Sequence, residues 1–189
     1  GNELYRTIEF SLSLGNSYLV IPWLPEERRN YEQFAEQLNF LAAELSQYRL
    51  RVGYHSHDFD LKPGEGGGPS GWQTLIERAD PSVMLQLDTA NALSVGVDPL
   101  PLLDAAGRRS VSIHMKEWAG EHGKACIGDG EVPWAGVAER AKANRTLWYI
   151  SEHEPGGAMD PYESVAGDLD GLVAQLGGDG LKRQDPPVC

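Results

Sequence analysis

Five short runs rich in β-forming residues recur along the chain at intervals of about 30 residues, which is the size of a βαβ unit. The runs cover residues 18–23, 51–55, 83–88, 110–116 and 147–152. Between the first two runs, apolar residues recur at three- and four-residue steps after Asn30, which predicts a helix with Asn30 as its N-cap. Further helical patterns cover residues 71–79, 99–106, 133–143 and 162–176. Strands that alternate with helices predict a parallel sheet with right-handed crossovers.

Each predicted strand carries polar side chains on one face near its C-terminal end. In the fourth run, Ile113 and Met115 point one way. His114 and Lys116 point the other way. Strands of an open doubly wound sheet are instead apolar on both faces. An apolar face toward helices and a polar face toward a shared interior is typical of a barrel, so we predict an α/β fold of the (β/α) TIM-barrel type, with its chemistry at the carboxyl ends of the strands.

The length of 189 residues predicts a single domain, which we place at residues 1–176, followed by a flexible tail at 177–189. Acidic residues outnumber basic ones by 28 to 16, so a net charge of -12 gives little attraction to phosphate backbones or anionic lipids. Nucleic-acid and membrane partners are therefore not expected. Cys126 and Cys189 match no metal or redox spacing, which favours a reducing compartment, and we expect a cytoplasmic location.

Four successive strand ends carry residues of types that bind metal ions. They are His55, Asp88, His114 and Glu152. Neighbouring strands of a barrel would bring these distant groups to one point. Two imidazoles and two carboxylates suit a borderline divalent ion such as Mn²⁺, Zn²⁺ or Co²⁺ better than a hard ion that binds oxygen alone. Each residue taken alone also fits an ordinary loop or capping role, but the four together predict a metal site.

Further candidates lie beside these four. His57 fits a general base or a contact to a sugar hydroxyl, and also a solvent-exposed loop histidine. Asp60 fits a contact to substrate hydroxyls or a turn residue. Lys116 fits a group that stabilises an oxyanion, or an exposed lysine on an acidic surface. Asn91 fits a substrate contact or a helix cap.

Two further residues are substrate-binding candidates. Trp23 fits a platform for a sugar ring or a core aromatic residue. Glu131 lies in the segment GDGEVPW at 128–134, which lacks the Lys-Ser/Thr ending of a phosphate-binding loop and fits a turn before a short helix, with Glu131 as a polar contact. No serine or cysteine lies in a nucleophile elbow, so covalent acyl chemistry is not expected.

Several motifs together resemble a known family. They are YHSHDFDL at 54–61, LDTANALSVGVDP at 87–99, IHMKE at 113–117, GDGEVPW at 128–134 and WYISE at 148–152. In order and spacing they resemble the sugar phosphate isomerase/epimerase family of xylose isomerase-like TIM barrels. The resemblance implies a divalent metal ion (Mn, Zn, Co or Mg), with Asp88, His114 and Glu152 on the family's ligand positions. His55 falls where many members carry Glu and others carry His.

The chain also differs from the family pattern. Ser56 and Asp60 replace an Asn and a Glu, and Glu117 replaces an Asp. These changes are conservative, so the resemblance implies an intact site whose substrate can differ. Members are complete barrels, and the five runs correspond to strands 4–8, so we expect an N-terminally incomplete barrel. Such a sheet would expose two edges, which natural proteins avoid, so we expect a fragment or a homo-oligomer that covers the open sheet edges.

Three functions fit these residues. The first is a divalent-metal-dependent isomerase or epimerase that acts on a sugar or polyol ketone through proton abstraction and an enediolate. Glu152 and His57 would move the proton, and Lys116 would orient hydroxyls. The second is a metal-dependent lyase or dehydratase that acts on a keto sugar or inosose. The third is a carbohydrate-binding remnant without turnover. Because few basic residues lie near the strand ends, we expect a substrate without a phosphate group.

Overall fold

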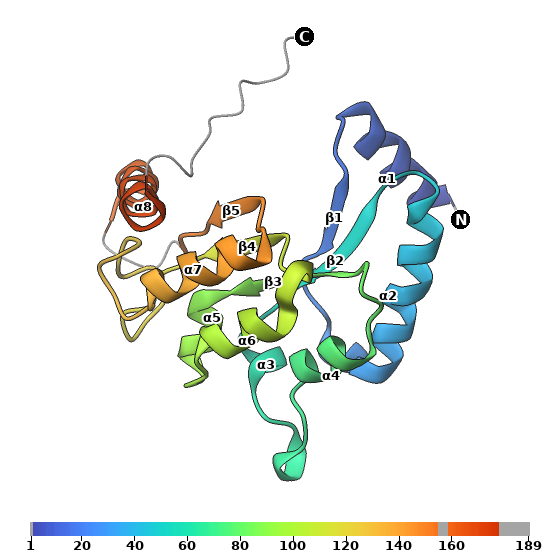
Figure 1. Ribbon diagram of the computed structural model, residues 1–189, viewed down its shortest axis with the longest axis horizontal. Coiled ribbons are helices and arrows are strands. Elements are labelled where there is room, and N and C mark those ends of the chain that lie inside the picture. The colour runs from blue at the N-terminus through green and yellow to red at the C-terminus, as the bar shows by residue number, and fades with distance from the viewer. Residues whose placement is uncertain (1, 155–158, 178–189) are drawn as a thin grey trace.

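A computed structural model describes residues 2–154 and 159–177 of the chain. Five strands form one parallel sheet, and their order in space follows their order in the sequence (Figure 1). The strands are β1 (Tyr18–Ile21), β2 (Arg51–His55), β3 (Met84–Asp88), β4 (Ser112–Met115) and β5 (Trp148–Ser151). All five lie within the runs that the sequence predicts. The parallel sheet is therefore confirmed, and it forms part of a (β/α) barrel.

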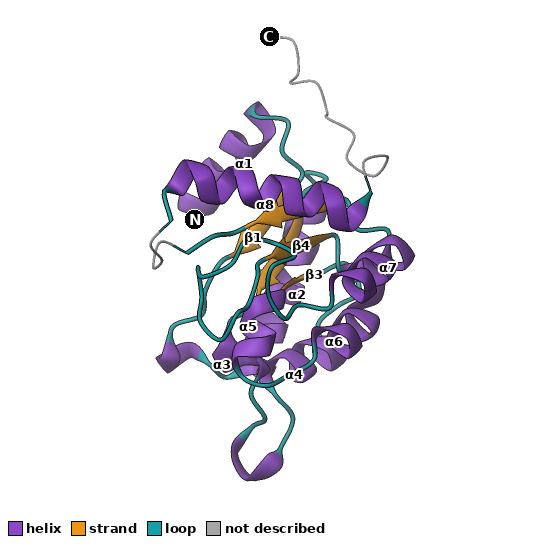
Figure 2. Ribbon diagram, turned by 90° about the vertical axis from the view of Figure 1, so that its left-hand side faces the viewer, coloured by secondary structure: helices purple, strands orange, loops and turns teal. Residues whose placement is uncertain are grey.

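Helices surround the strands, which lie at the centre of the molecule (Figure 2). The helices are α1 (Asn2–Ser13), α2 (Tyr31–Ser46), α3 (Asp58–Leu61), α4 (Gly71–Arg78), α5 (Thr89–Ser94), α6 (Pro99–Ala106), α7 (Trp134–Asn144) and α8 (Pro161–Leu176). Short 3-10 turns cover Glu26–Arg28, Glu65–Gly67 and Gly107–Arg109. The helical patterns of the sequence are confirmed as α2, α4, α6, α7 and α8. The apolar faces of the strands pack against these helices in one continuous core.

Helix α2 begins at its predicted N-cap and buries its apolar stripe against the sheet. The Asn30 side chain accepts a hydrogen bond from the Gln33 N–H at 3.1 Å, which satisfies one of the free donors at the helix start. Phe34 and Leu38 are buried on the inner face of the helix. The Phe34 ring meets the Tyr54 ring of β2 edge to face at 5.0 Å. Burial of each such side chain stabilises the fold by about 1.5–3 kcal/mol.

Three helices were not predicted, and two of them turn the chain directly after a strand. Helix α5 follows β3 and uses Asp88 as its N-cap, and α3 follows β2 after His57. With six and four residues, these helices are too short for a helical period to appear in the sequence. These two helices keep the polar residues that follow β2 and β3 close to the carboxyl end of the sheet. The third helix, α1, precedes β1.

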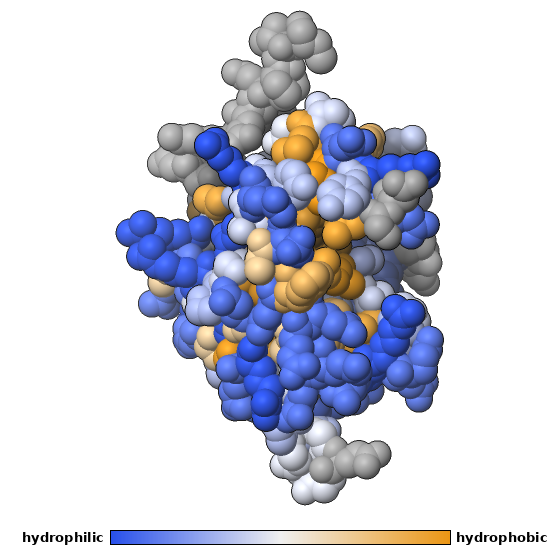
Figure 3. All heavy atoms as spheres, turned by 90° about the vertical axis from the view of Figure 1, so that its right-hand side faces the viewer, coloured by the Kyte–Doolittle hydropathy of each residue, from blue (hydrophilic) through white to orange (hydrophobic). Residues whose placement is uncertain are grey.

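Within the described residues, β1 and β5 each pair with a single neighbour, so both edges of the sheet are open. Large apolar side chains are exposed near both of these edges. Near β5 they are Leu147, Trp148 and Ile150, together with a stripe on α8 formed by Tyr162, Val165, Leu169 and Val173. On α1 they are Tyr5, Phe10 and Leu12, and Leu14 follows directly after the helix. Figure 3 shows apolar side chains gathered on the side of the molecule formed by α1 and α2. A second copy that covers these edges stays a prediction.

No described helix is long and apolar enough to cross a membrane. The predicted flexible tail lies, from residue 178 onward, outside the described residues. The division into a domain at 1–176 and a tail at 177–189 stays a prediction.

Candidate metal centre

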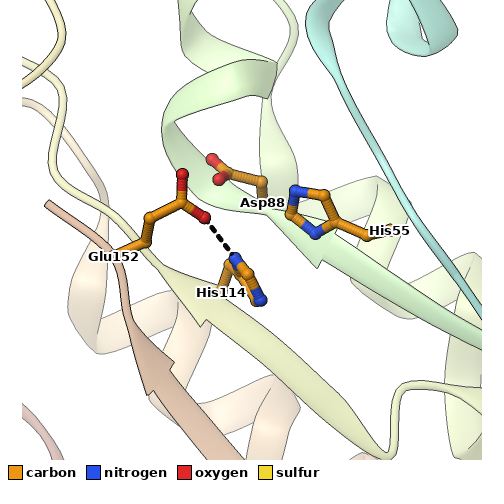
Figure 4. Close-up of side chains that lie close together, drawn as sticks. All are labelled: His55, Asp88, His114 and Glu152. Carbon is orange, nitrogen blue, oxygen red and sulfur yellow. Dashed lines mark hydrogen bonds and ion pairs between the residues drawn. The ribbon is translucent and has the colours of Figure 1, made fainter. Parts of the chain in front are cut away.

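Side chains from four neighbouring strands converge at the carboxyl end of the sheet (Figure 4). They are His55 at the end of β2, Asp88 at the end of β3, His114 in β4 and Glu152 directly after β5. Each side chain offers one ligand atom, and these atoms all lie within 4.8 Å of one another. His55 and Asp88 are buried, whereas His114 and Glu152 are partly exposed. The cluster is therefore reached from the side of β4 and β5.

Two buried atoms of this cluster have no hydrogen-bond partner among the described residues. They are Nδ1 of His55 and Oδ2 of Asp88. The other Asp88 oxygen, Oδ1, accepts a hydrogen bond from the Asn91 N–H at 2.8 Å. A buried polar atom left without a partner costs about 1–3 kcal/mol. An imidazole nitrogen and a carboxylate oxygen are ligands of borderline divalent ions, so these residues fit a metal that would satisfy both atoms.

Hydrogen bonds between strand ends fix the positions of these side chains. The Asp88 N–H donates to Ser56 Oγ at 3.1 Å, and Asn91 Nδ2 donates to the Ser56 carbonyl at 3.2 Å, which joins β2 to β3. Thr89 Oγ1 donates to the Lys116 carbonyl at 2.7 Å and accepts from the Lys116 N–H at 3.1 Å, which joins β3 to β4. Sequence reasoning missed Ser56 and Thr89 in this role. Their position next to a predicted ligand was the available signal.

Lys116 and Glu152 form the charged part of the site. Lys116 Nζ donates to Glu152 Oε1 at 2.9 Å and to Glu154 Oε1, and it lies 3.9 Å from Asp88 Oδ2. Glu152 Oε2 lies 2.6 Å from His114 Nδ1. Hydrogen bonds with His114 and Lys116 outweigh burial and hold the pKa of Glu152 well below its usual range. Burial opposes the charged form of Lys116, but attraction to the three carboxylates prevails and raises its pKa. Glu152 and Lys116 are therefore both charged at neutral pH. Glu154, which pairs with Lys116, is a residue of this site that sequence reasoning missed.

Burial controls the charge of the remaining groups. It lowers the pKa of His55 to about 3, with further lowering by His114 and His57. It also lowers the pKa of His57, whose ring lies 4.9 Å from the His55 ring. Burial raises the pKa of Asp88 to about 6, against the attraction of Lys116. The two histidines are neutral at neutral pH, so a ring nitrogen of each is free to bind a metal or to accept a proton.

Comparison with known proteins agrees with this architecture. The family described as xylose isomerase-like TIM barrel matches residues 2–170. The chain belongs to this family. No match is found among curated proteins.

Solved structures of similar shape support the family assignment. A sugar phosphate isomerase/epimerase from Parabacteroides distasonis matches with a TM-score of 0.76 and 22% identity, over 91% of this chain and 62% of that one. An L-ribulose 3-epimerase matches with a TM-score of 0.66 and 13% identity, over 97% of this chain and 71% of that one. A D-psicose 3-epimerase matches with a TM-score of 0.64 and 14% identity, over 93% and 70%. The chain spans less than two thirds of the Parabacteroides distasonis protein, and these identities show a shared fold.

In this xylose isomerase-like barrel, Asp60 lies fully buried in α3, the short helix that begins after its N-cap His57. Its carboxylate accepts hydrogen bonds from the Tyr31 hydroxyl at 2.6 Å, the Tyr54 hydroxyl at 3.0 Å and the His57 N–H at 2.7 Å. Burial raises the pKa of Asp60 to about 6, although these three bonds favour the ionised form. The carboxylate therefore holds the His57 backbone, and its contact with a substrate stays a prediction.

The stability of the protein is expected to depend on pH through Asp60. The pKa of Asp60 is about 6 in the folded protein, whereas an unfolded Asp titrates near ~3.9. The stabilising contribution is therefore fully present below about pH 4 and is lost as the pH rises through about 6. Urea unfolding of the wild type and of Asp60→Asn checks this. As the pH rises through about 6, the unfolding free energy of the wild type should fall relative to that of Asp60→Asn. A difference that stays constant over this range would contradict the assignment.

The other predicted substrate contacts are distributed differently. Asn91 is buried beside Asp88 and Ser56, where its amide donates to the Ser56 carbonyl. Trp23 is half exposed in the segment after β1. Glu131 has an exposed side chain, and its N–H donates to the Trp118 carbonyl at 2.8 Å. The structure therefore brings Asn91 to the cluster of His55, Asp88, His114 and Glu152, and it joins neither Trp23 nor Glu131 to that cluster by a hydrogen bond among the described residues.

Glu117 organises the segment between β4 and α7, and sequence reasoning missed this role. The side chain is buried directly after the strand end that carries His114 and Lys116. Its carboxylate accepts four hydrogen bonds at 2.6–3.1 Å, from the N–H groups of Trp118, Gly128 and Val132 and from the indole N–H of Trp134. The segment therefore folds around one buried carboxylate. No local sequence pattern predicts this role of Glu117, because three of the four donors lie eleven or more residues away in the sequence.

Proposed function

We propose that the protein is a divalent-metal-dependent isomerase or epimerase that acts on a sugar or polyol ketone. The observation that carries the proposal is the convergence of two imidazoles and two carboxylates, with buried His55 Nδ1 and Asp88 Oδ2 free to bind a ligand. Similar structures described as L-ribulose 3-epimerase and D-psicose 3-epimerase support the choice of reaction class. A borderline ion such as Mn²⁺, Zn²⁺ or Co²⁺ suits the mixed donors better than Mg²⁺.

Four residues would hold the ion in this proposal: His55, Asp88, His114 and Glu152. A divalent ion bound there would polarise the substrate carbonyl and lower the energy of an enediolate. Ser56 and Thr89 keep the strand ends in register through their backbone hydrogen bonds, so the ligands are held in place before a substrate arrives.

Proton transfer would fall to Glu152 and His57. Glu152 is ionised, and one of its carboxylate oxygens would take the proton from the carbon next to the carbonyl. His57 is neutral and lies beside His55, so a ring nitrogen would serve as the second acceptor. The Lys116 ammonium would stabilise negative charge on the substrate oxygens. Because Lys116 already pairs with Glu152 and Glu154, it has little capacity left for a phosphate, and we propose a substrate without one.

Exchange of a carbon-bound proton with solvent tests this function. We expect the Co²⁺- or Mn²⁺-loaded protein, incubated in D₂O with a panel of ketopentoses and ketohexoses, to place deuterium on the carbon next to the carbonyl and to form the epimer or the aldose. Mass spectrometry and NMR measure both. An unsaturated product from a keto sugar would favour the lyase alternative. No exchange with any sugar of the panel would count against the proposal.

A further inference from the structure

Asp168, in the middle of α8, contacts the residues on both sides of Glu152. The residue is 1% exposed. Oδ2 accepts a hydrogen bond from the Ser151 hydroxyl at 2.8 Å and lies 3.6 Å from His153 Nδ1. Oδ1 accepts a hydrogen bond from the Ile127 N–H at 3.0 Å. One buried carboxylate therefore joins α8, the end of β5 and the segment between β4 and α7.

The backbone around Glu152 has little other support. Strand β5 ends at Ser151, one residue before Glu152. The Glu152 N–H reaches the Met115 carbonyl at 3.5 Å, which is long for a hydrogen bond. Along an extended chain, neighbouring side chains point to opposite sides. Because Ser151 and His153 are both directed to Asp168, the side chain between them is directed the other way, toward His114 and Lys116.

Helix α8 is attached to the segment before it by other contacts. Leu172 is buried in the core. At Gly167 an added Cβ would lie 2.6 Å from Cys126 Sγ, and at Gly171 it would lie against the Ile127 carbonyl, so the helix packs closely there because both positions lack a side chain. Attachment of the helix therefore does not depend on the charge of Asp168 alone. The carboxylate instead satisfies polar groups that flank Glu152.

We propose that Asp168 is a positioning residue that orients Glu152 toward the metal centre. It acts through Ser151 and His153 and does not touch the ligands. The inference rests in part on the proposed function, since that assigns Glu152 as a ligand. The orientation itself is tested apart from metal binding, through the contact between Glu152 Oε2 and His114 Nδ1 at 2.6 Å.

Two measurements on Asp168→Ala test the proposal, with Leu172→Ala as the matched control on the same helix. Calorimetric titration with Co²⁺ should show an affinity about tenfold or more below the wild type for Asp168→Ala, which is the range seen when groups that orient metal ligands are removed. Leu172→Ala should weaken the fold but change the affinity by less than about twofold. In the metal-free protein, the ¹⁵N NMR signal of His114 Nδ1 should shift in Asp168→Ala and stay unchanged in Leu172→Ala.

Each outcome supports or overturns one of the two proposals. If the wild type does not bind Co²⁺, the proposed metal centre fails, while the NMR signal of His114 still decides the role of Asp168. If the wild type binds Co²⁺ and Asp168→Ala matches it in affinity and in the NMR signal, the positioning role is overturned. Equal losses of affinity in both variants would also overturn it, in favour of a general effect of α8. Should Asp168→Ala fail to fold, Ser151→Ala removes one flanking hydrogen bond and is expected to shift the same signal.

Discussion

Replacing Glu152 with Gln is expected to lower the rate of solvent proton exchange into a keto sugar by about 10²–10⁴-fold, the range lost with a positioned acid or base. The amide is nearly the same size as the carboxylate, but it is neutral and cannot accept a proton at neutral pH. It also pairs more weakly with Lys116 and His114, which now lie 2.9 Å and 2.6 Å from the carboxylate oxygens. The rate at saturating metal and sugar, followed by NMR in D₂O, measures the effect.

Two controls separate chemistry from folding in this experiment. The circular dichroism spectrum and the unfolding midpoint of Glu152→Gln should stay close to the wild type, because the side chain is partly exposed. Glu139→Gln, on the exposed surface of α7, should exchange protons at the wild-type rate. An unchanged rate in Glu152→Gln would remove Glu152 from the mechanism, and an equal loss in Glu139→Gln would mean that the assay does not report on the site.

Replacing Glu117 with Ala is expected to lower the free energy of unfolding by about 3–5 kcal/mol. The substitution leaves four N–H donors around a buried position without their acceptor, and each buried donor left unpaired costs about 1–3 kcal/mol before water reaches it. Part of this cost is relieved as the segment between β4 and α7 opens to solvent. Equilibrium urea denaturation measures the loss.

Glu131→Ala is the matched control for Glu117, because it removes a carboxylate from the same segment. Its side chain is exposed, so the expected change is within about 0.5 kcal/mol. The fluorescence of Trp134, whose indole N–H donates to Glu117 at 2.6 Å, should shift toward that of an exposed tryptophan in Glu117→Ala alone. A stability loss equal to that of Glu131→Ala would mean that the buried carboxylate is dispensable.

The strands and the convergence of His55, Asp88, His114 and Glu152 were predictable because both follow from periods that repeat along the chain. Alternation of side chains within each strand predicted that His114 lies on the polar face. The interval of about 30 residues predicted βαβ units, in which successive strands are parallel neighbours. Parallel neighbours then bring Asp88 level with His114, as the register of β3 and β4 shows. Local sequence patterns were therefore sufficient to predict the location of a side chain wherever its position in a strand determines that location.

The supporting residues were not predictable from the same patterns. Glu117 and Asp168 act on backbone N–H groups and side chains that lie far away in the sequence, and these partners have no characteristic residue type. For Asp60 the sequence left open a substrate contact or a turn residue, because Asp is common in turns. Its burial depends on Tyr31 and Tyr54, which approach it from another helix and from a strand. Three-dimensional packing decided these roles.

Because both edges of the described sheet are open, we expect self-association of the protein to depend on ionic strength. Among the described residues, the outer edges of β1 and β5 have N–H and C=O groups without a strand partner, and these groups can pair with a strand of another molecule; the apolar side chains around Trp148 favour such pairing. The net charge of -12 opposes it, because like-charged copies repel over about 10 Å at 0.1 M salt. Added salt shortens that range, so we expect self-association to increase with ionic strength.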